Sequence, residues 1–175
     1  RIGMKYNKQQ PIIELSSNLK VLMLDALHDG LGNKFYKCQP NLDEAKKLGV
    51  STIVSFGGAW SNHIYALARL GNEQGFNTVG VIRGEEPAVP SSMLEDAKSW
   101  GMKLEFVSRS SYRDKDSPSL VKLLEDKYGA FYLIPEGGSN VLAVNGCRRI
   151  VEELSAHTQQ WDLLVLPVGT GGTIA

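Results

Sequence analysis

The chain has 175 residues, of which 42% are hydrophobic and 22% are charged, so it can bury a core and is not expected to be disordered. Its 19 basic and 19 acidic residues give a formal net charge of zero, which does not favour a nucleic-acid partner. No apolar run approaches the roughly 20 residues that a membrane helix needs. We therefore expect a globular protein whose partners include neither nucleic acid nor a membrane.

The two cysteines, Cys38 and Cys147, lie far apart in the sequence and lack the spacing of metal ligands. Together with three scattered histidines they do not predict a metal site. The first residues have no apolar stretch of the kind that a secretory signal carries. We therefore expect reduced thiols and a cytoplasmic location.

Short apolar runs rich in β-branched residues alternate along the chain with longer segments of helical period. Glycines at positions 49, 71, 75, 101 and 129 are predicted to end helices. The polar stretch 108–119 is predicted to be an exposed loop that leads into a helix. The apolar runs predict strands at 20–24, 52–56, 78–82, 103–107, 130–134 and 163–167.

The alternation of strands and helices indicates parallel strands joined by right-handed crossovers. Near-continuous apolar strands are typical of a sheet that is covered on both faces. The sequence therefore predicts an α/β fold, with parallel twisted sheets and helices on both faces. Because the chain stops at Ala175, where a helix should begin, we expect it to be incomplete at its C-terminus.

Three glycine-rich loops follow predicted strands, at the edge where parallel sheets bind ligands. Loop 57–63 offers Ser61 or Asn62 as a helix cap, and its backbone N–H groups could bind a carboxylate. Loop 137–140 also precedes a predicted helix. For both loops, an ordinary capped turn is the alternative interpretation.

The third loop, 169–173, has the sequence Gly-Thr-Gly-Gly-Thr, in which successive N–H groups can form a nest for phosphate. It lacks the Gly-Lys-Ser/Thr ending of a Walker A loop and the spacing of a dinucleotide fingerprint. A small phosphorylated cofactor such as pyridoxal phosphate (PLP) remains, and PLP enzymes need a lysine for the Schiff base. Lys34, in a glycine-bounded loop just before a predicted helix, is the candidate.

Four segments taken in order resemble one family: Asp-Gly-Leu-Gly-Asn-Lys (29–34), Phe-Gly-Gly-Ala-Trp-Ser-Asn-His (56–63), Ile-Pro-Glu-Gly-Gly-Ser-Asn (134–140) and Pro-Val-Gly-Thr-Gly-Gly-Thr (167–173). The resemblance is to the 1-aminocyclopropane-1-carboxylate (ACC) deaminase and D-cysteine desulfhydrase family, which are PLP enzymes of the tryptophan-synthase-β fold type. It implies a larger PLP-binding domain from residues 1–50 and 137–175, and a smaller α/β domain from residues 51–136.

The resemblance also implies a role for each matching position. Lys34 would form the Schiff base with PLP and act as the proton-transferring base, while Asn62 would hydrogen-bond the ring hydroxyl. Ser61, with the backbone at Asn62 and His63, would hold the substrate carboxylate, and Ser61 could also serve as a nucleophile or proton relay. The phosphate would be bound by the loop residues Gly169, Thr170, Gly171, Gly172 and Thr173.

The function that the resemblance implies is a PLP-dependent deaminase or lyase, which would be a homodimer at full length. It would convert a small amino acid, ACC or D-cysteine, to an α-keto acid and ammonia. One alternative is a non-catalytic or fragmentary paralogue that holds PLP or phosphate without turnover. Another is a nucleotide-binding α/β module, although no glycine-rich loop follows the first strand. His63 could contact the substrate or make a local hydrogen bond, and Trp60 could line the cleft or pack in the core.

Overall fold

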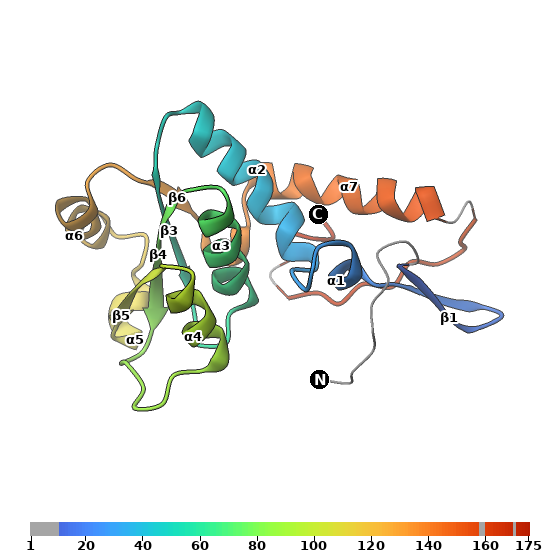
Figure 1. Ribbon diagram of the computed structural model, residues 1–175, viewed down its shortest axis with the longest axis horizontal. Coiled ribbons are helices and arrows are strands. Elements are labelled where there is room, and N and C mark those ends of the chain that lie inside the picture. Colours follow the sequence, from blue (N-terminus) through green and yellow to red (C-terminus); the bar gives the residue numbers. More distant parts are fainter. Residues whose placement is uncertain (1–10, 158–159, 170) are drawn as a thin grey trace.

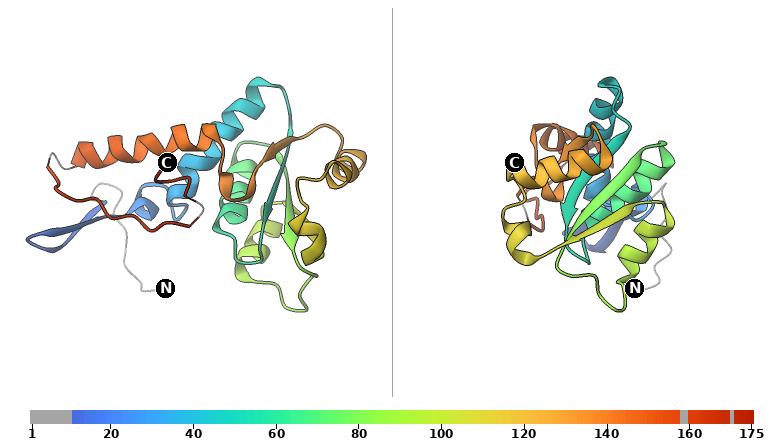
Figure 2. Two further views of the ribbon diagram at one scale, coloured as in Figure 1. Left: turned by 180° about the vertical axis from the view of Figure 1, so that it is seen from behind. Right: turned by 90° about the vertical axis from the view of Figure 1, so that its left-hand side faces the viewer.

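A computed structural model describes residues 11–157, 160–169 and 171–175 of the chain (Figure 1). A parallel sheet with helices on both faces forms one end of the molecule, and a pair of helices with a small hairpin forms the other (Figure 1, Figure 2). This arrangement confirms the predicted α/β class. Among the described residues, no helix combines the length and the apolar character that crossing a membrane requires.

The N-terminal part begins with an antiparallel hairpin of β1 (Ile12–Ser16) and β2 (Leu19–Leu22). The short helix α1 (Leu24–Leu27) and the long helix α2 (Asn33–Lys47) follow. The strand predicted at 20–24 corresponds to β2, whereas β1 was not predicted. Both strands are short and largely exposed, so they lack the continuous apolar run that marks a buried strand.

The main sheet has the strand order β5-β4-β3-β6, with every neighbouring pair parallel. Two helices, α3 and α4, connect its first three strands. The elements in chain order are β3 (Thr52–Gly57), α3 (Asn62–Glu73), β4 (Asn77–Arg83), α4 (Ser92–Ser99), β5 (Lys103–Val107) and β6 (Tyr132–Ile134).

Two helices, α5 (Arg109–Arg113) and α6 (Pro118–Tyr128), lie between β5 and β6. The prediction of a loop at 108–119 is therefore wrong for α5, whereas residues 114–117 are non-helical and lead into α6 as predicted. Serine caps explain the helix: the Ser108 hydroxyl accepts a hydrogen bond from the Ser111 N–H at 3.1 Å. After β6 come the 3-10 turn η1 (Glu136–Gly138) and the helix α7 (Val141–His157).

The central strand β3 carries the core on both of its faces. Ile53 faces α3 and packs with Ile64 and Leu67, whereas Val54 belongs to the opposite cluster, with Tyr112 of α5 and Leu124 of α6. Because side chains alternate along a strand, one buried strand serves two helical layers. Figure 1 shows α3 and α4 on one side of the sheet and α5 and α6 on the other.

The segment 163–167 is irregular and exposed, so the prediction of a strand there is wrong. Leu163 and Val165 are 79% and 80% exposed. A strand needs a hydrogen-bonded neighbour, and no strand of the described residues pairs with this segment. The apolar, β-branched sequence alone does not make a strand.

Gly71 was predicted to end a helix, but it lies inside α3 and is buried. A Cβ at this position would overlap the Thr78 side chain on β4, so the glycine allows α3 to lie close to the sheet. The other four predicted glycines, at positions 49, 75, 101 and 129, do follow helices.

Helix α7 approaches α2 most closely at Gly146. A Cβ at this position would overlap the Tyr36 carbonyl oxygen and would lie 2.7 Å from Pro40 Cγ. Pro40 lies inside α2 and has no N–H, so it cannot hydrogen-bond the Tyr36 carbonyl as a normal helical residue would. Pro40 has no N–H and Gly146 has no side chain. Together these two features allow the backbones of α2 and α7 to come into contact.

We predict that Gly146→Ala destabilises the protein by about 1–3 kcal/mol, because overpacking outweighs the roughly 1 kcal/mol by which alanine favours a helix. Chemical denaturation measures the change. The exposed neighbour Asn145→Ala is the matched control and should stay within about 0.5 kcal/mol. An equally stable Gly146→Ala protein would contradict this account of the helix contact.

Candidate functional site

Lys34 is the second residue of α2, and not part of a loop before the helix as predicted. Gly32 precedes the helix with a φ of 54°, and a Cβ there would lie 2.5 Å from Asp25 Oδ1, so this turn requires glycine. Burial lowers the pKa of Lys34, and the positive charge of Lys37 lowers it further. A larger share of its amine is therefore neutral near pH 8 than in an exposed lysine, which favours nucleophilic attack.

Lys34 shares a small pocket with the glycine-rich loop 169–173. The pocket measures about 50 Å³, which is well below the ~300 Å³ or more of a typical small-molecule site. Asn33 Nδ2 donates to Thr173 Oγ1 at 2.9 Å and joins the start of α2 to the loop. Thr170 lies outside the described residues. The pocket is lined by Asn33, Lys34, Lys37, Pro167, Val168, Gly169, Gly171, Thr173 and Ile174.

Lys37 belongs to the same pocket but was not singled out from the sequence. It is 1% exposed, and its Nζ lies 3.0 Å from the position that a Cβ on Gly172 would occupy. No hydrogen bond or ion pair joins its ammonium to another described residue. A buried cation beside a loop of backbone N–H groups favours an anion, which fits the phosphate of PLP. The i, i+3 spacing from Lys34 is the signal that could have found it.

A second group of predicted site residues, Ser61, Asn62 and His63, lies at the start of α3. The Ser61 hydroxyl caps the helix by accepting a hydrogen bond from the Ile64 N–H at 3.2 Å, and it keeps its own proton to donate. Asn62 is the exposed first residue of the helix, so its N–H and that of His63 have no acceptor within the helix. Trp60, 71% exposed, is outside the core. This helix start can bind a carboxylate.

The His63 side chain points into the core and not toward a substrate. Its Nε2 lies 2.8 Å from Ser55 Oγ, which itself donates to the Ile134 carbonyl at 2.8 Å, so Nε2 carries the proton. Its Nδ1 faces Cys38 Sγ at 3.6 Å. Burial lowers the pKa of His63 to about 3, with a further contribution from Lys34 and Lys37. Only its backbone N–H remains for the predicted role in substrate binding.

Loop 137–140 connects β6 to the site. A Cβ on Gly138 would lie 3.3 Å from Lys37 Cβ and from His63 Cε1, so this turn packs directly on both residues. Asn140 caps α7 by accepting from the Ala143 N–H at 2.9 Å. Its amide nitrogen also donates to Asn41 Oδ1 at 2.7 Å, which ties the loop to α2.

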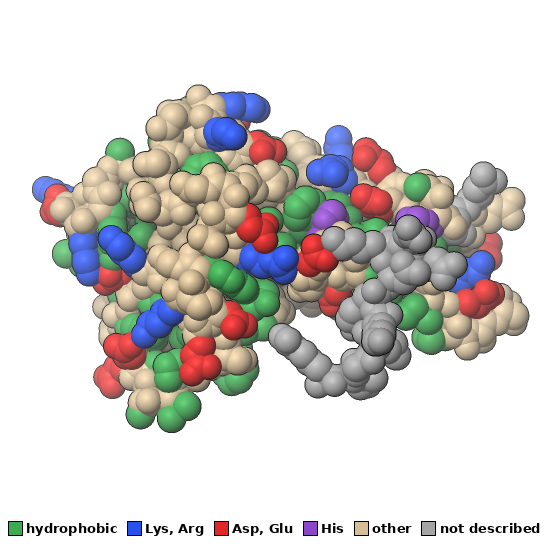
Figure 3. Space-filling view, in the orientation of Figure 1, with side chains coloured by type: hydrophobic (Ala, Val, Ile, Leu, Met, Phe, Trp, Pro, Cys, Tyr) green, Lys and Arg blue, Asp and Glu red, His purple; other side chains and the backbone are tan. Residues whose placement is uncertain are grey.

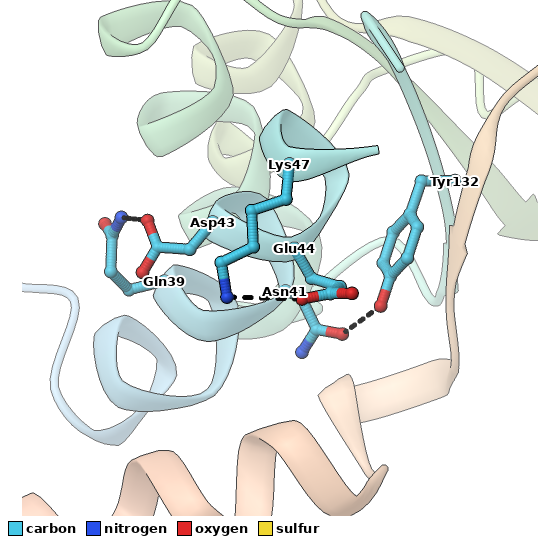
Figure 4. Close-up of polar contacts among 6 residues, drawn as sticks. All are labelled: Gln39, Asn41, Asp43, Glu44, Lys47 and Tyr132. Carbon is cyan, nitrogen blue, oxygen red and sulfur yellow. Dashed lines mark hydrogen bonds and ion pairs between the residues drawn. The ribbon is translucent and has the colours of Figure 1, made fainter. Parts of the chain in front are cut away.

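Asn41 is fully buried and links three elements. Its amide nitrogen donates to the Lys37 carbonyl at 2.8 Å. Its oxygen accepts from the Tyr132 hydroxyl at 3.3 Å, as Figure 4 shows. On the exposed face of α2, Gln39 contacts Asp43 and Lys47 contacts Glu44 within the helix (Figure 4). Gln39 also accepts a hydrogen bond from Gln74, just after α3, at 2.9 Å. The Asn41 contacts fix the position of the helix that carries both pocket lysines.

Comparison with known proteins identifies the class that this fold and site define. Residues 6–175 match the family of pyridoxal-phosphate dependent enzymes, and the chain belongs to that family. A lysine, a glycine-rich loop and a buried ammonium suit a phosphorylated aldehyde, and PLP is the cofactor of this family.

More specific similarity is to proteins named for ACC deamination. The chain is 36% identical over 150 residues to a Thermotoga maritima protein provisionally named 1-aminocyclopropane-1-carboxylate deaminase, covering 83% of this chain and 48% of that one. It is 29% identical over 160 residues to an Arabidopsis thaliana mitochondrial bifunctional D-cysteine desulfhydrase/1-aminocyclopropane-1-carboxylate deaminase, covering 82% of this chain and 40% of that one. The chain thus spans about half the length of the curated relatives that it matches, or less.

Solved structures show the same fold. The crystal structure of an ACC deaminase homologue superposes with a TM-score of 0.74 at 25% identity, over 89% of this chain and 48% of that one. O-ureido-L-serine synthase superposes with a TM-score of 0.72 at 19% identity, over 97% and 54%. The expected tryptophan-synthase-β-like fold is confirmed, and so is the resemblance to the ACC deaminase family.

We predict that stability falls as the pH drops from 6.5 toward 3, because the unfolded chain binds a proton at His63 and the folded chain does not. This residue alone adds a slope of up to about 1.4 kcal/mol per pH unit, with stability increasing with pH. Denaturation midpoints at several pH values measure it. His63→Gln should flatten the slope, whereas the control His157→Gln, at the exposed end of α7, should not. Equal slopes in the two variants would contradict the prediction.

Proposed function

We propose that the full-length protein is a PLP-dependent lyase or deaminase, which releases ammonia and an α-keto acid from a small amino acid. ACC and D-cysteine are the proposed substrates, because relatives carry those names. The observation that carries the proposal is the pocket in which Lys34, with its lowered pKa, lies beside a glycine-rich loop and the buried Lys37.

Lys34 is proposed to anchor the cofactor and to move protons. Its partly neutral amine attacks an aldehyde more readily than a protonated surface lysine does. ACC carries no proton on Cα, so for this substrate the same Nζ, once released from the cofactor, can act only on a ring methylene, whereas from D-cysteine it can take the proton on Cα. Bound PLP supplies an electron sink for the negative charge that is left at that carbon.

Two groups are proposed to orient the ligands. The Lys37 ammonium and the N–H groups of loop 169–173 hold the phosphate, so that the anion neutralises a cation that is otherwise buried without a partner among the described residues. The Ser61 hydroxyl and the N–H groups at the start of α3 bind the substrate carboxylate, and Asn62 hydrogen-bonds the ring hydroxyl of the cofactor.

A second candidate function is binding of PLP or phosphate without turnover. The small volume of the pocket, about 50 Å³, supports it, because this space suits a phosphate group and not a whole cofactor together with a substrate. An assay of keto-acid release by the full-length protein with ACC, D-cysteine and L-serine separates the candidates. A protein that binds PLP but forms no keto acid from any of them would support the second.

Lys34→Ala should abolish the lysine-linked PLP absorbance and the borohydride-trapped adduct, because the anchoring amine is gone. Lys37→Gln should keep the adduct but weaken PLP affinity by about 10–100-fold, since one charge-assisted contact to phosphate is lost. PLP titration followed by absorbance measures both. The control Lys46→Gln changes an exposed lysine of the same helix and should leave affinity unchanged. A trapped adduct that survives Lys34→Ala would remove Lys34 from its proposed role.

Ser61→Ala should raise KM for the amino acid by about tenfold or more, because a hydrogen bond to a charged carboxylate is lost. Ser108→Ala is the matched control, since Ser108 caps α5 with the same geometry. Both changes cost about 1 kcal/mol of stability through the lost cap, but only the first should change KM. Steady-state kinetics and denaturation curves on both variants test this. An equal KM in the two variants would argue against Ser61 as a substrate ligand.

A further inference from the structure

A second hollow, of about 570 Å³, lies at the carboxyl ends of β4 and β5, on the face of the sheet that α5 and α6 cover. Arg83 is the last residue of β4, Arg109 and Arg113 belong to α5, and Glu136 begins η1. The hollow shares no lining residue with the Lys34 pocket. Its lining consists of Arg83, Arg109, Tyr112, Arg113, Lys115 and Glu136.

The hollow concentrates positive charge in a protein whose formal net charge is zero. It has four cationic side chains and one carboxylate, and that carboxylate, on Glu136, pairs with Lys115 at 3.5 Å. Within the described part of the chain, no carboxylate forms an ion pair with the three arginines. On the face shown in Figure 3, basic and acidic side chains are interspersed, so this excess of cations is local.

Tyr112 forms a rigid floor for the hollow. It is 4% exposed, and its ring packs edge-on against Phe56 with 6.1 Å between the centroids. The Arg83 guanidinium and the Lys115 ammonium lie 5.7 Å and 5.5 Å from the ring centroid. The Tyr112 hydroxyl is near Glu136 but finds no partner with hydrogen-bond geometry among the described residues. Burial and the neighbouring Glu136 raise the pKa of Tyr112, so it stays neutral and adds no negative charge to the hollow.

We infer that this hollow binds a small, multiply charged oxyanion, separately from the cofactor. Guanidinium groups bind phosphate and carboxylate oxygens through two parallel hydrogen bonds, and three of them lie around one floor. A single carboxylate would leave most of this charge unneutralised, whereas a phosphorylated molecule or a polycarboxylate would neutralise it. The volume exceeds that of an inorganic ion, so a small organic anion fits.

The position of the hollow in the fold also supports its binding of a ligand. Arg83 Nη2 lies 3.8 Å from the position of a Cβ on Gly58, and Glu136 directly precedes Gly137. The hollow therefore borders the turns that follow β3 and β6, at the edge of the sheet where ligands bind in parallel α/β folds.

Isothermal titration of the full-length, PLP-loaded protein tests the inference, with pyrophosphate as the phosphate probe and citrate as the polycarboxylate probe. We expect one pyrophosphate site whose affinity falls with added salt and whose occupation leaves the PLP absorbance unchanged. Arg109→Gln/Arg113→Gln should weaken binding about 100-fold, since two charged hydrogen-bonding groups are lost. Citrate binding tightly in place of pyrophosphate would identify polycarboxylates as the ligand source.

Two further variants test whether binding depends on the hollow itself. Arg83→Gln removes the guanidinium that lies over the Tyr112 ring and should weaken binding by about tenfold. Lys46→Gln/Lys122→Gln removes two exposed lysines outside the hollow and should have little effect. The inference is overturned if neither probe binds, if binding is unchanged in the arginine variant, or if the probes displace PLP. Because binding is measured directly, the result does not depend on the proposed activity.

Discussion

The close contact of α7 with α2 at Gly146 holds the helix that carries both pocket lysines. It works through the Tyr36 carbonyl, whose usual helical partner is missing because residue 40 is a proline. Asn41, one residue later, adds hydrogen bonds to β6 and to the start of α7. Lys34 and Lys37 lie within two turns of this point. Their positions relative to the glycine-rich loops therefore depend on one small area of helix packing.

Electrostatics in the pocket follow from that packing. Two lysines one turn apart on a buried helix face repel one another, and this repulsion adds to burial in lowering the pKa of Lys34. His63 lies against the same cluster but stays neutral, because burial and the charges of Lys34 and Lys37 lower its pKa to about 3. The site thus holds its positive charge on lysines alone, in a place where an anion is the matching ligand.

The sequence alone predicted those helices and strands whose residue pattern can be recognised within a single segment. The strands β3, β4 and β5 are short segments rich in β-branched and large apolar residues that follow glycines, and the α3 face that includes Ile64 and Leu67 repeats with helical period. The order of the glycine-rich loops indicated the family. Residues 163–167 have the same local signal, but a strand depends on its neighbours, which a single segment does not reveal.

The candidate site was only partly predictable, for a related reason. Lys34 and loop 169–173 were found by their motifs, and the structure brings them into one pocket. Lys37 was missed because its burial results from the packing of α2 against loops more than a hundred residues away. His63 matched a motif that suggests a ligand contact, yet its side chain is directed inward by hydrogen bonds to Ser55 on β3. Its orientation is a property of the folded core.

The burial of the two cysteines has a consequence for chemical selectivity. Cys38 and Cys147 lie near the pocket lysines, and thiolates compete with amines for aldehydes. Burial raises the pKa of Cys38 to about 12 and also raises that of Cys147. At neutral pH both therefore remain protonated, poorly nucleophilic thiols. An aldehyde that enters this pocket therefore reacts with an amine in preference to a thiol, and the lowered pKa favours Lys34, although sulfur lies close by.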